Sequence, residues 1–205
     1  MTYKQQIAEA AEWRLIGLLL ERPRAGWHDE VARLAAEVRD LELREAASAA
    51  ASAGEGDYLA SLGPGGAVSP REVTYQPWAD PGHLLAQLAM LYDAFAFRPQ
   101  VEEPLDHIAV EVAFVSYLLL KQAFAAARGD SEAAATTAAA RDLFLESHLA
   151  YSAAPFAQRL AAAGATYLRA AAHRLAARVP DAPPVLLPGA TLDAAGLCGG
   201  CEGLE

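Results

Sequence analysis

Apolar residues recur at helical spacing along most of this chain, and almost no stretch alternates with the period of two that a half-buried strand requires. Alanine, the strongest intrinsic helix former, makes up roughly a quarter of the residues, and few β-branched runs remain to build strands. Hydrophobic residues make up 54% of the chain and charged residues 20%, which excludes a mainly disordered protein. The pattern therefore predicts an all-α fold.

Prolines and glycines divide this helical pattern into segments. The spacing predicts helices over residues 3–21, 27–53, 81–97, 104–128, 130–149 and 155–179. Leu41 and Phe124 are among the residues that the spacing turns inward. Residues 63–81 contain four prolines and read as one long loop, and long loops in compact domains are often functional.

A short connector between Pro99 and Pro104 separates two helical halves, and Pro104 suits the first position of the next helix. We expect a bundle of about six or more helices in two packed halves. The expected divisions are one domain over residues 1–179, with halves at 1–97 and 104–179 and a hinge at 98–103, and a Pro/Gly-rich tail at 180–205.

The chain is strongly acidic, with 16 Lys and Arg against 26 Asp and Glu, a formal net charge of −10. This balance excludes the electrostatic footprint of a nucleic-acid binder or of a protein that docks on anionic lipid, and it favours a basic partner. The N-terminus shows no secretory pattern, and the longest apolar runs fall short of the roughly 20 residues that a membrane span needs. We expect a cytoplasmic protein without stable membrane insertion.

The densest group of titratable residues runs from Glu102 to His107, with Glu111 one helical turn further on. In one interpretation Pro104 begins a helix, Asp106 complements the helix dipole in the first turn, and the glutamates are solvated. In a second, the cluster binds an arginine-bearing peptide through bidentate, charge-assisted hydrogen bonds. A third pairs His107 with Glu111 as metal ligands, although two ligands make no site.

Other candidate residues lie outside this cluster. His148, one turn after Phe144, is expected to hydrogen-bond a neighbouring helix or connector rather than to catalyse. Tyr75 and Trp78 lie in the proline-rich loop, where Trp78 is the better candidate to line a peptide groove.

The two cysteines, Cys198 and Cys201, lie in the last eight residues, so no disulfide framework holds the core. Their CxxC lacks the strand-to-helix setting of a thioredoxin-like enzyme, and a metal would need two further ligands. An unstructured tail is the simpler interpretation. The chain also lacks a phosphate-binding loop, a nucleophile elbow and a zincin motif, so we expect no cofactor and no catalytic residues.

Three features together resemble the TorD/DmsD-like chaperones, the redox enzyme maturation proteins that include the nitrate-reductase chaperone branch. They are the Glu103-Pro104-Leu105-Asp106-His107 box between two apolar helices, the segment Phe144–Leu149 followed by Pro155-Phe156, and the acidic, alanine- and leucine-rich helical chain. The resemblance covers Tyr92 to Leu168.

The resemblance implies a cytoplasmic, all-helical chaperone that binds the twin-arginine signal peptide and the apo catalytic subunit of a molybdenum enzyme related to dimethyl sulfoxide reductase. Such chaperones hold that subunit until its molybdenum cofactor is inserted, before export. The expected client-binding residues are Glu103, Pro104, Asp106, His107, Trp78, Tyr75 and His148. We expect Asp106 and His107 to face a groove between the halves, Asp106 being partly exposed, in a monomer or homodimer.

An alternative of a different class is a helical metal-binding protein or enzyme. Its ligands would be His107, Glu111, His148, Cys198 and Cys201.

Overall fold

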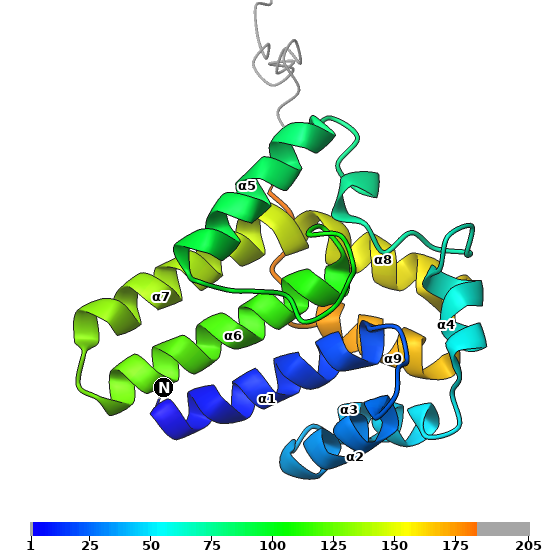
Figure 1. Ribbon diagram of the computed structural model, residues 1–205, viewed down its shortest axis with the longest axis horizontal. Helices are drawn as coiled ribbons and strands as arrows, with labels where there is room; N and C mark the ends of the chain where they lie inside the picture. Colours follow the sequence, from blue (N-terminus) through cyan, green and yellow to red (C-terminus); the bar gives the residue numbers. More distant parts are fainter. Residues whose placement is uncertain (1, 184–205) are drawn as a thin grey trace, which may run out of the picture.

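Helix α1 (Tyr3–Leu20) and helix α6 (Ile108–Ala127) lie antiparallel along each other in the computed structural model, which describes residues 2–183 (Figure 1). The Ser116 hydroxyl donates to the carbonyl of Ala10 at 2.8 Å. A Cβ atom at Gly17 would lie 3.3 Å from Cγ1 of Val112, so the glycine permits this close approach. The α1–α6 pair forms the centre of the bundle.

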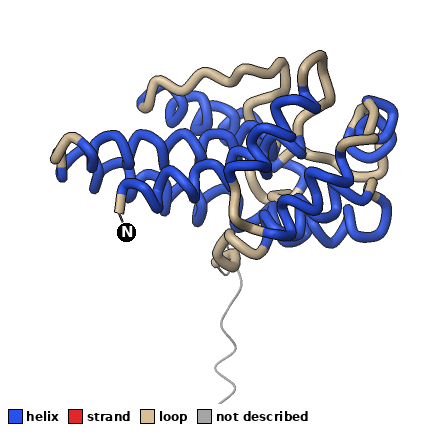
Figure 2. The backbone as a smooth tube through the Cα atoms, turned by 90° about the horizontal axis from the view of Figure 1, so that it is seen from below, coloured by secondary structure: helices blue, strands red, loops and turns tan. Residues whose placement is uncertain are grey.

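The other helical elements surround this pair. They are α2 (Trp27–Glu37), α3 (Leu41–Ala50), α4 (Glu55–Leu62), the 3-10 turn η1 (Glu72–Thr74), α5 (Pro81–Ala94), α7 (Ser131–Phe144), the π-helix η2 (Leu145–Leu149), α8 (Ala150–Ala163) and α9 (Thr166–Ala176). Helix α7 packs on α6, while α9 packs against α8, α3 and α1. Figure 2 shows helices and loops and no strand in the part of the chain that is described. The prediction of an all-α bundle is confirmed.

One hydrophobic core joins residues from both predicted halves. Helix α5 contributes Tyr92, whose ring centroid lies 4.8 Å from that of Phe114 on α6 and 5.1 Å from that of Phe97. Phe144 completes this aromatic group, 4.9 Å from Phe114. The division into halves at residues 98–103 stays a prediction.

The prediction of one helix over residues 27–53 is wrong, because two helices occupy this segment. Helix α2 ends at Glu37, and Asp40 caps α3 by accepting from the backbone N–H of Leu43 at 3.2 Å. The same carboxylate binds Arg174 and Arg178 at the end of α9, so its capping and ion pairing favour a break there. Leu41, predicted inward, begins α3 on the exposed side.

Two further segments differ from the predicted helices. Pro155 lies inside α8, which continues past it with one backbone hydrogen bond fewer, and the break falls instead at Gly164. Helix α4 forms in a stretch after residue 53 for which no helix is predicted, and the side chain of Asp57 accepts from the N–H of Gly54 at 2.9 Å to begin it. Phe124, predicted inward, is exposed near the end of α6.

Helix α6 is long and apolar enough by length and composition to cross a membrane, with a mean hydropathy of 1.6 over its best window. Glu111 and Lys121 interrupt its apolar sequence, so no run without a charge reaches the length of a membrane span, as predicted. Of that window, 67% is buried inside the bundle, as in the central helix of a globular domain. Most of the predicted tail lies outside the described residues. Both Cys198 and Cys201 belong to that part.

Candidate functional site

The acidic box from Glu102 to His107 connects α5 to α6 and pairs with the loop before η1. The N–H of Glu72 donates to the carbonyl of Asp106 at 2.8 Å, and the N–H of Ile108 donates to that of Pro70 at 2.9 Å. These bonds surround an isolated antiparallel bridge between Arg71 and His107. The box and the long loop, 35 residues apart in sequence, therefore form one structural unit.

His107 is the N-cap of α6, because its Nδ1 accepts from the N–H of Ala109 at 3.1 Å. Its Nε2 lies 3.1 Å from the Tyr58 hydroxyl of α4, to which the neutral ring donates. Burial, with the charge of Arg71 as a smaller cause, lowers the pKa of His107 to about 3, so the ring is neutral near pH 7. Pro104 accepts from the N–H of His107 in a turn, so the prediction that Pro104 begins the helix is wrong.

Asp106 is fully buried beneath this turn. Its Oδ1 lies 2.5 Å from Nε of Arg71, while its Oδ2 has no hydrogen-bond partner among the described residues. The expectation that Asp106 is partly exposed and faces a groove is wrong, because the pairing with residues 70–72 turns its side chain inward. Asp106 lies just before the N-cap of α6 and not in its first helical turn. The interpretation that Asp106 complements the helix dipole in the first turn is therefore wrong.

A second buried polar group joins η1 to the π-helix. Nδ1 of His148 lies 3.1 Å from both carboxylate oxygens of Glu72, and the Gln76 amide donates to Glu72 at 2.5 Å. The prediction that His148 hydrogen-bonds a neighbouring connector is confirmed. Glu111 is also fully buried; burial, followed by the negative charges of Glu72 and Asp106, raises its pKa well above the ordinary value. Burial and these charges therefore favour the protonated form of Glu111.

The outer face of the box carries the accessible carboxylates. Glu102 and Pro104 are exposed, and Glu103 is half-buried. A hollow of about 320 Å³ lies beside them, between Glu103, Pro104, Arg71 and the glycine-rich turn at residues 63–66. This face offers negative charge above a base fixed by buried hydrogen bonds.

The two loop aromatics differ in accessibility. Trp78 is 46% exposed, and its ring packs edge-on against Tyr151 of α8 with centroids 5.6 Å apart. Tyr75 is buried, donates its hydroxyl to the carbonyl of Ser69 at 2.7 Å and lies under the guanidinium of Arg159. Trp78 can therefore meet a ligand directly, while Tyr75 holds the loop.

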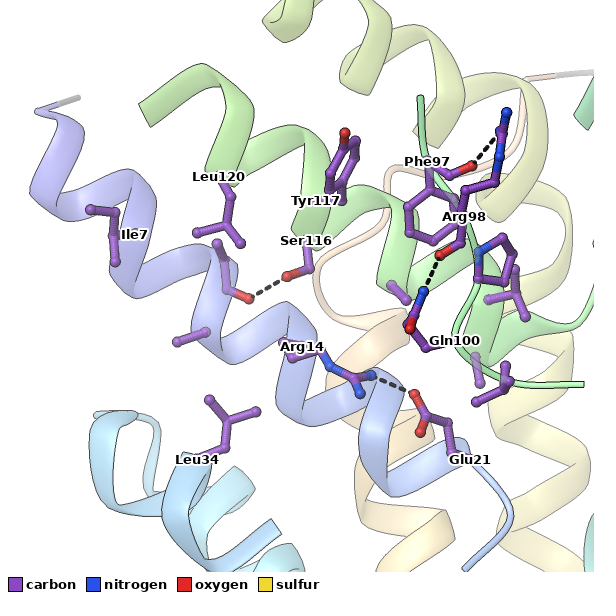
Figure 3. A pocket seen from close by; sticks show the side chains of 17 residues that line it. Ile7, Arg14, Glu21, Leu34, Phe97, Arg98, Gln100, Ser116, Tyr117 and Leu120 are labelled. Atoms are coloured by element: carbon purple, nitrogen blue, oxygen red, sulfur yellow. Dashed lines mark hydrogen bonds and ion pairs between the residues drawn. The ribbon is translucent and has the colours of Figure 1, made fainter. Parts of the chain in front are cut away.

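An apolar groove of about 450 Å³ lies between α1, α6 and the connector at residues 97–101 (Figure 3). Ile7, Phe97 and Leu120 form parts of its wall. At one end Arg14 and Glu21 form an ion pair with Nη1 2.5 Å from Oε1. Neither the box nor Trp78 lines this groove, so it is a separate surface.

The ligands required by the metal-binding alternative do not gather in the described part of the chain. Residues 2–183 contain no group of three or more His, Cys, Asp or Glu that could hold an ion. The ring nitrogens of His107 contact Ala109 and Tyr58, while His148 faces Glu72.

Residues 24–158 match the model of a family described as nitrate reductase delta subunit. The chain belongs to this family. The family comprises chaperones that act in the maturation of molybdoenzymes, which confirms the resemblance to the TorD/DmsD-like chaperones. No curated protein and no solved structure matched the chain.

The match to the nitrate reductase delta subunit family contains the whole of the acidic box and its partners. Three of those partners, Tyr58, Arg71 and Glu72, were missed at the level of sequence. Arg71 and Glu72 are the only charged residues in the stretch 63–79, a signal that could have singled them out. Tyr58 gave no such signal, because nothing in the sequence connects α4 with a histidine 49 residues later.

Proposed function

We propose that this chain is a cytoplasmic chaperone that binds the twin-arginine leader and the apo catalytic subunit of a molybdenum enzyme related to dimethyl sulfoxide reductase. It assists insertion of the molybdenum cofactor before export. The family supports the general role in molybdoenzyme maturation. The mechanism is binding alone: the chaperone shields an exposed segment and performs no covalent step.

The observation that carries the leader-binding part of the proposal is the accessible acidic face of the box. Glu102 and Glu103 lie on a turn whose base is fixed by the Asp106–Arg71 ion pair and the His107–Tyr58 hydrogen bond. Two adjacent carboxylates at the surface suit guanidinium groups, which bind carboxylates through paired, charge-assisted hydrogen bonds. The net charge of −10 favours the approach of a basic leader.

The candidate residues divide into two roles in this proposal. Glu102, Glu103, Pro104 and Trp78 touch the client, because they reach the surface. Buried Asp106, His107, His148 and Tyr75 act as positioning residues that hold the box and the loop in place. 

Calorimetric titration with a synthetic twin-arginine leader, taken from a molybdoenzyme catalytic subunit of the same genome, tests this site. The double variant Glu102→Gln/Glu103→Gln should bind the peptide about tenfold or more weakly, since charge-assisted hydrogen bonds are lost. Wild-type binding should weaken as salt is raised. The matched control, Glu37→Gln/Glu45→Gln, removes two exposed carboxylates elsewhere. Equal affinities for both double variants would refute the leader site.

A further inference from the structure

The apolar groove of Figure 3 extends further along α6. A second cavity of about 420 Å³ shares Tyr117 and Leu120 with the first and reaches Arg128. Together the two cavities follow α6 from Ala109 to Arg128, a length of about 28 Å at the helical rise. We call this surface the α6 groove.

Large apolar side chains are exposed along the α6 groove. Ile7 of α1 and Leu120 of α6 are each 47% exposed, and Phe124 lies one turn beyond Leu120. These are three of the eight large apolar side chains exposed among the described residues. Such clustering on one surface is typical of a protein interaction site.

The charged residues of the α6 groove have the opposite balance to the chain as a whole. The lining contains four cations and two anions, which are Arg14, Arg98, Lys121, Arg128, Glu21 and Asp130. Both anions are already engaged, since Glu21 is paired with Arg14 and Asp130 caps α7 through the N–H of Ala133.

Two of the cations are available to a partner. Lys121 donates to the carbonyl of Phe95, and the Arg128 guanidinium lies over the Phe124 ring. Neither forms an ion pair with a residue in the range 2–183. The α6 groove therefore combines an apolar floor with positive charge at its far end.

We propose that the α6 groove binds an amphipathic helix of a partner protein, about five turns long, in which acidic residues flank an apolar stripe. The apolar stripe packs on Ile7, Leu120 and Phe124, and the acidic residues meet Lys121 and Arg128. A basic twin-arginine leader has the wrong charge for this surface. The proposal therefore adds a second docking surface and does not rest on the leader site at the box.

Fluorescence anisotropy with two labelled helical peptides of about 18 residues tests the charge preference. Both peptides carry leucines at helical spacing, one with flanking glutamates and the other with lysines at the same positions. The full chain should bind the glutamate peptide about tenfold or more tightly than the lysine peptide. The double variant Lys121→Glu/Arg128→Glu should reverse this order.

The matched control is Arg39→Glu/Arg44→Glu, which reverses two exposed cations on another surface and should keep the wild-type order. Leu120→Asp, at a half-exposed position, should abolish binding of the glutamate peptide while the thermal unfolding midpoint stays near that of wild type. The twin-arginine leader should bind the charge-reversed variant as it binds wild type, which separates this proposal from the leader site.

Three outcomes would overturn the proposal. The lysine peptide could bind as tightly as the glutamate peptide, or the control reversal could have the same effect as the α6-groove reversal. Alternatively, sedimentation could show a wild-type dimer that Leu120→Asp dissociates, in which case a second copy of this chain covers the α6 groove.

Discussion

Nε of Arg71 lies 2.5 Å from Oδ1 of Asp106, and this ion pair joins the loop before η1 to the turn that begins α6. The carboxylate is fully buried, whereas the arginine side chain is 35% exposed. A buried carboxylate that loses its cation is left uncompensated, so the pair is a stability determinant of the box.

Arg71→Ala is expected to lower the free energy of unfolding by about 2–3 kcal/mol, below the range for a fully buried pair because the arginine is partly solvated. Urea denaturation measures this difference. Arg98→Ala provides the control, since its ion pair with Asp93 is exposed on both sides and should contribute less than about 1 kcal/mol. Equal losses for the two variants would contradict the burial of Asp106.

His107 should make stability depend on pH in mildly acidic solution. Its pKa is about 3 in the folded protein and near 6.5 in the unfolded chain, so the unfolded chain binds more protons between these values. Its contribution is complete above about pH 6.5 and decreases as the pH falls toward 3, by up to about 1.4 kcal/mol per pH unit. His107→Asn keeps a capping side chain, and its free energy of unfolding should no longer show this decrease when denaturation is measured at several pH values. His173→Asn, at an exposed histidine, should show the same decrease as wild type.

Glu111 should act in the opposite direction. Its pKa is raised in the folded protein, so its contribution to stability is complete below about pH 4.5 and decreases as the pH rises through the folded pKa. Glu111→Gln resembles the protonated side chain and should be increasingly more stable than wild type as the pH rises toward 8. Chemical denaturation at several pH values checks this, with exposed Glu37→Gln as the control. A constant difference across the series would show that Glu111 is ionised in the folded protein.

Ala96 has a φ of 55°, in the left-handed region that alanine rarely adopts. Ala96→Gly removes a backbone strain of about 1–2 kcal/mol, which stabilises the folded protein. It also raises the entropy of the unfolded chain, which costs about 0.4–1 kcal/mol of stability. The melting temperature should therefore stay constant or rise slightly. In contrast, Ala86→Gly on the exposed side of α5 should cost about 1 kcal/mol. A similar loss at both positions would contradict the left-handed turn.

The long apolar periodicities made the main helices predictable, and α1 and α6 lie within one or two residues of their expected ends apart from the start of α6. The errors occur where one side chain outweighs the local pattern. Asp40 binds Arg174 of α9 and Arg178 just beyond it, interactions across 134 or more residues that no window of sequence contains. Pro155 lies inside α8 without ending it, although proline lacks the N–H for one backbone hydrogen bond and is usually unfavourable there.

The position of the site in the sequence was predictable, but the burial of its side chains was not. The sequence located the box and named its carboxylates and histidine. It could not show that Asp106 and His107 point inward, because their partners, Arg71 and Tyr58, come from separate segments. The α6 groove was also missed, since exposed Leu120 and Phe124 follow the same spacing as the buried residues of α6.

The π-helix at Leu145–Leu149 has a consequence for how the gene can vary. Each π-turn closes over one residue more than an α-turn, as though a single codon had been inserted between α7 and α8. Deleting one codon there would restore an ordinary helix and rotate α7 against α8 by about 100°. Phe144 and His148, whose rings stack 4.8 Å apart, could then no longer face Phe114 and Glu72 together. We therefore expect the length of this segment to be more tightly constrained than the identity of its exposed residues.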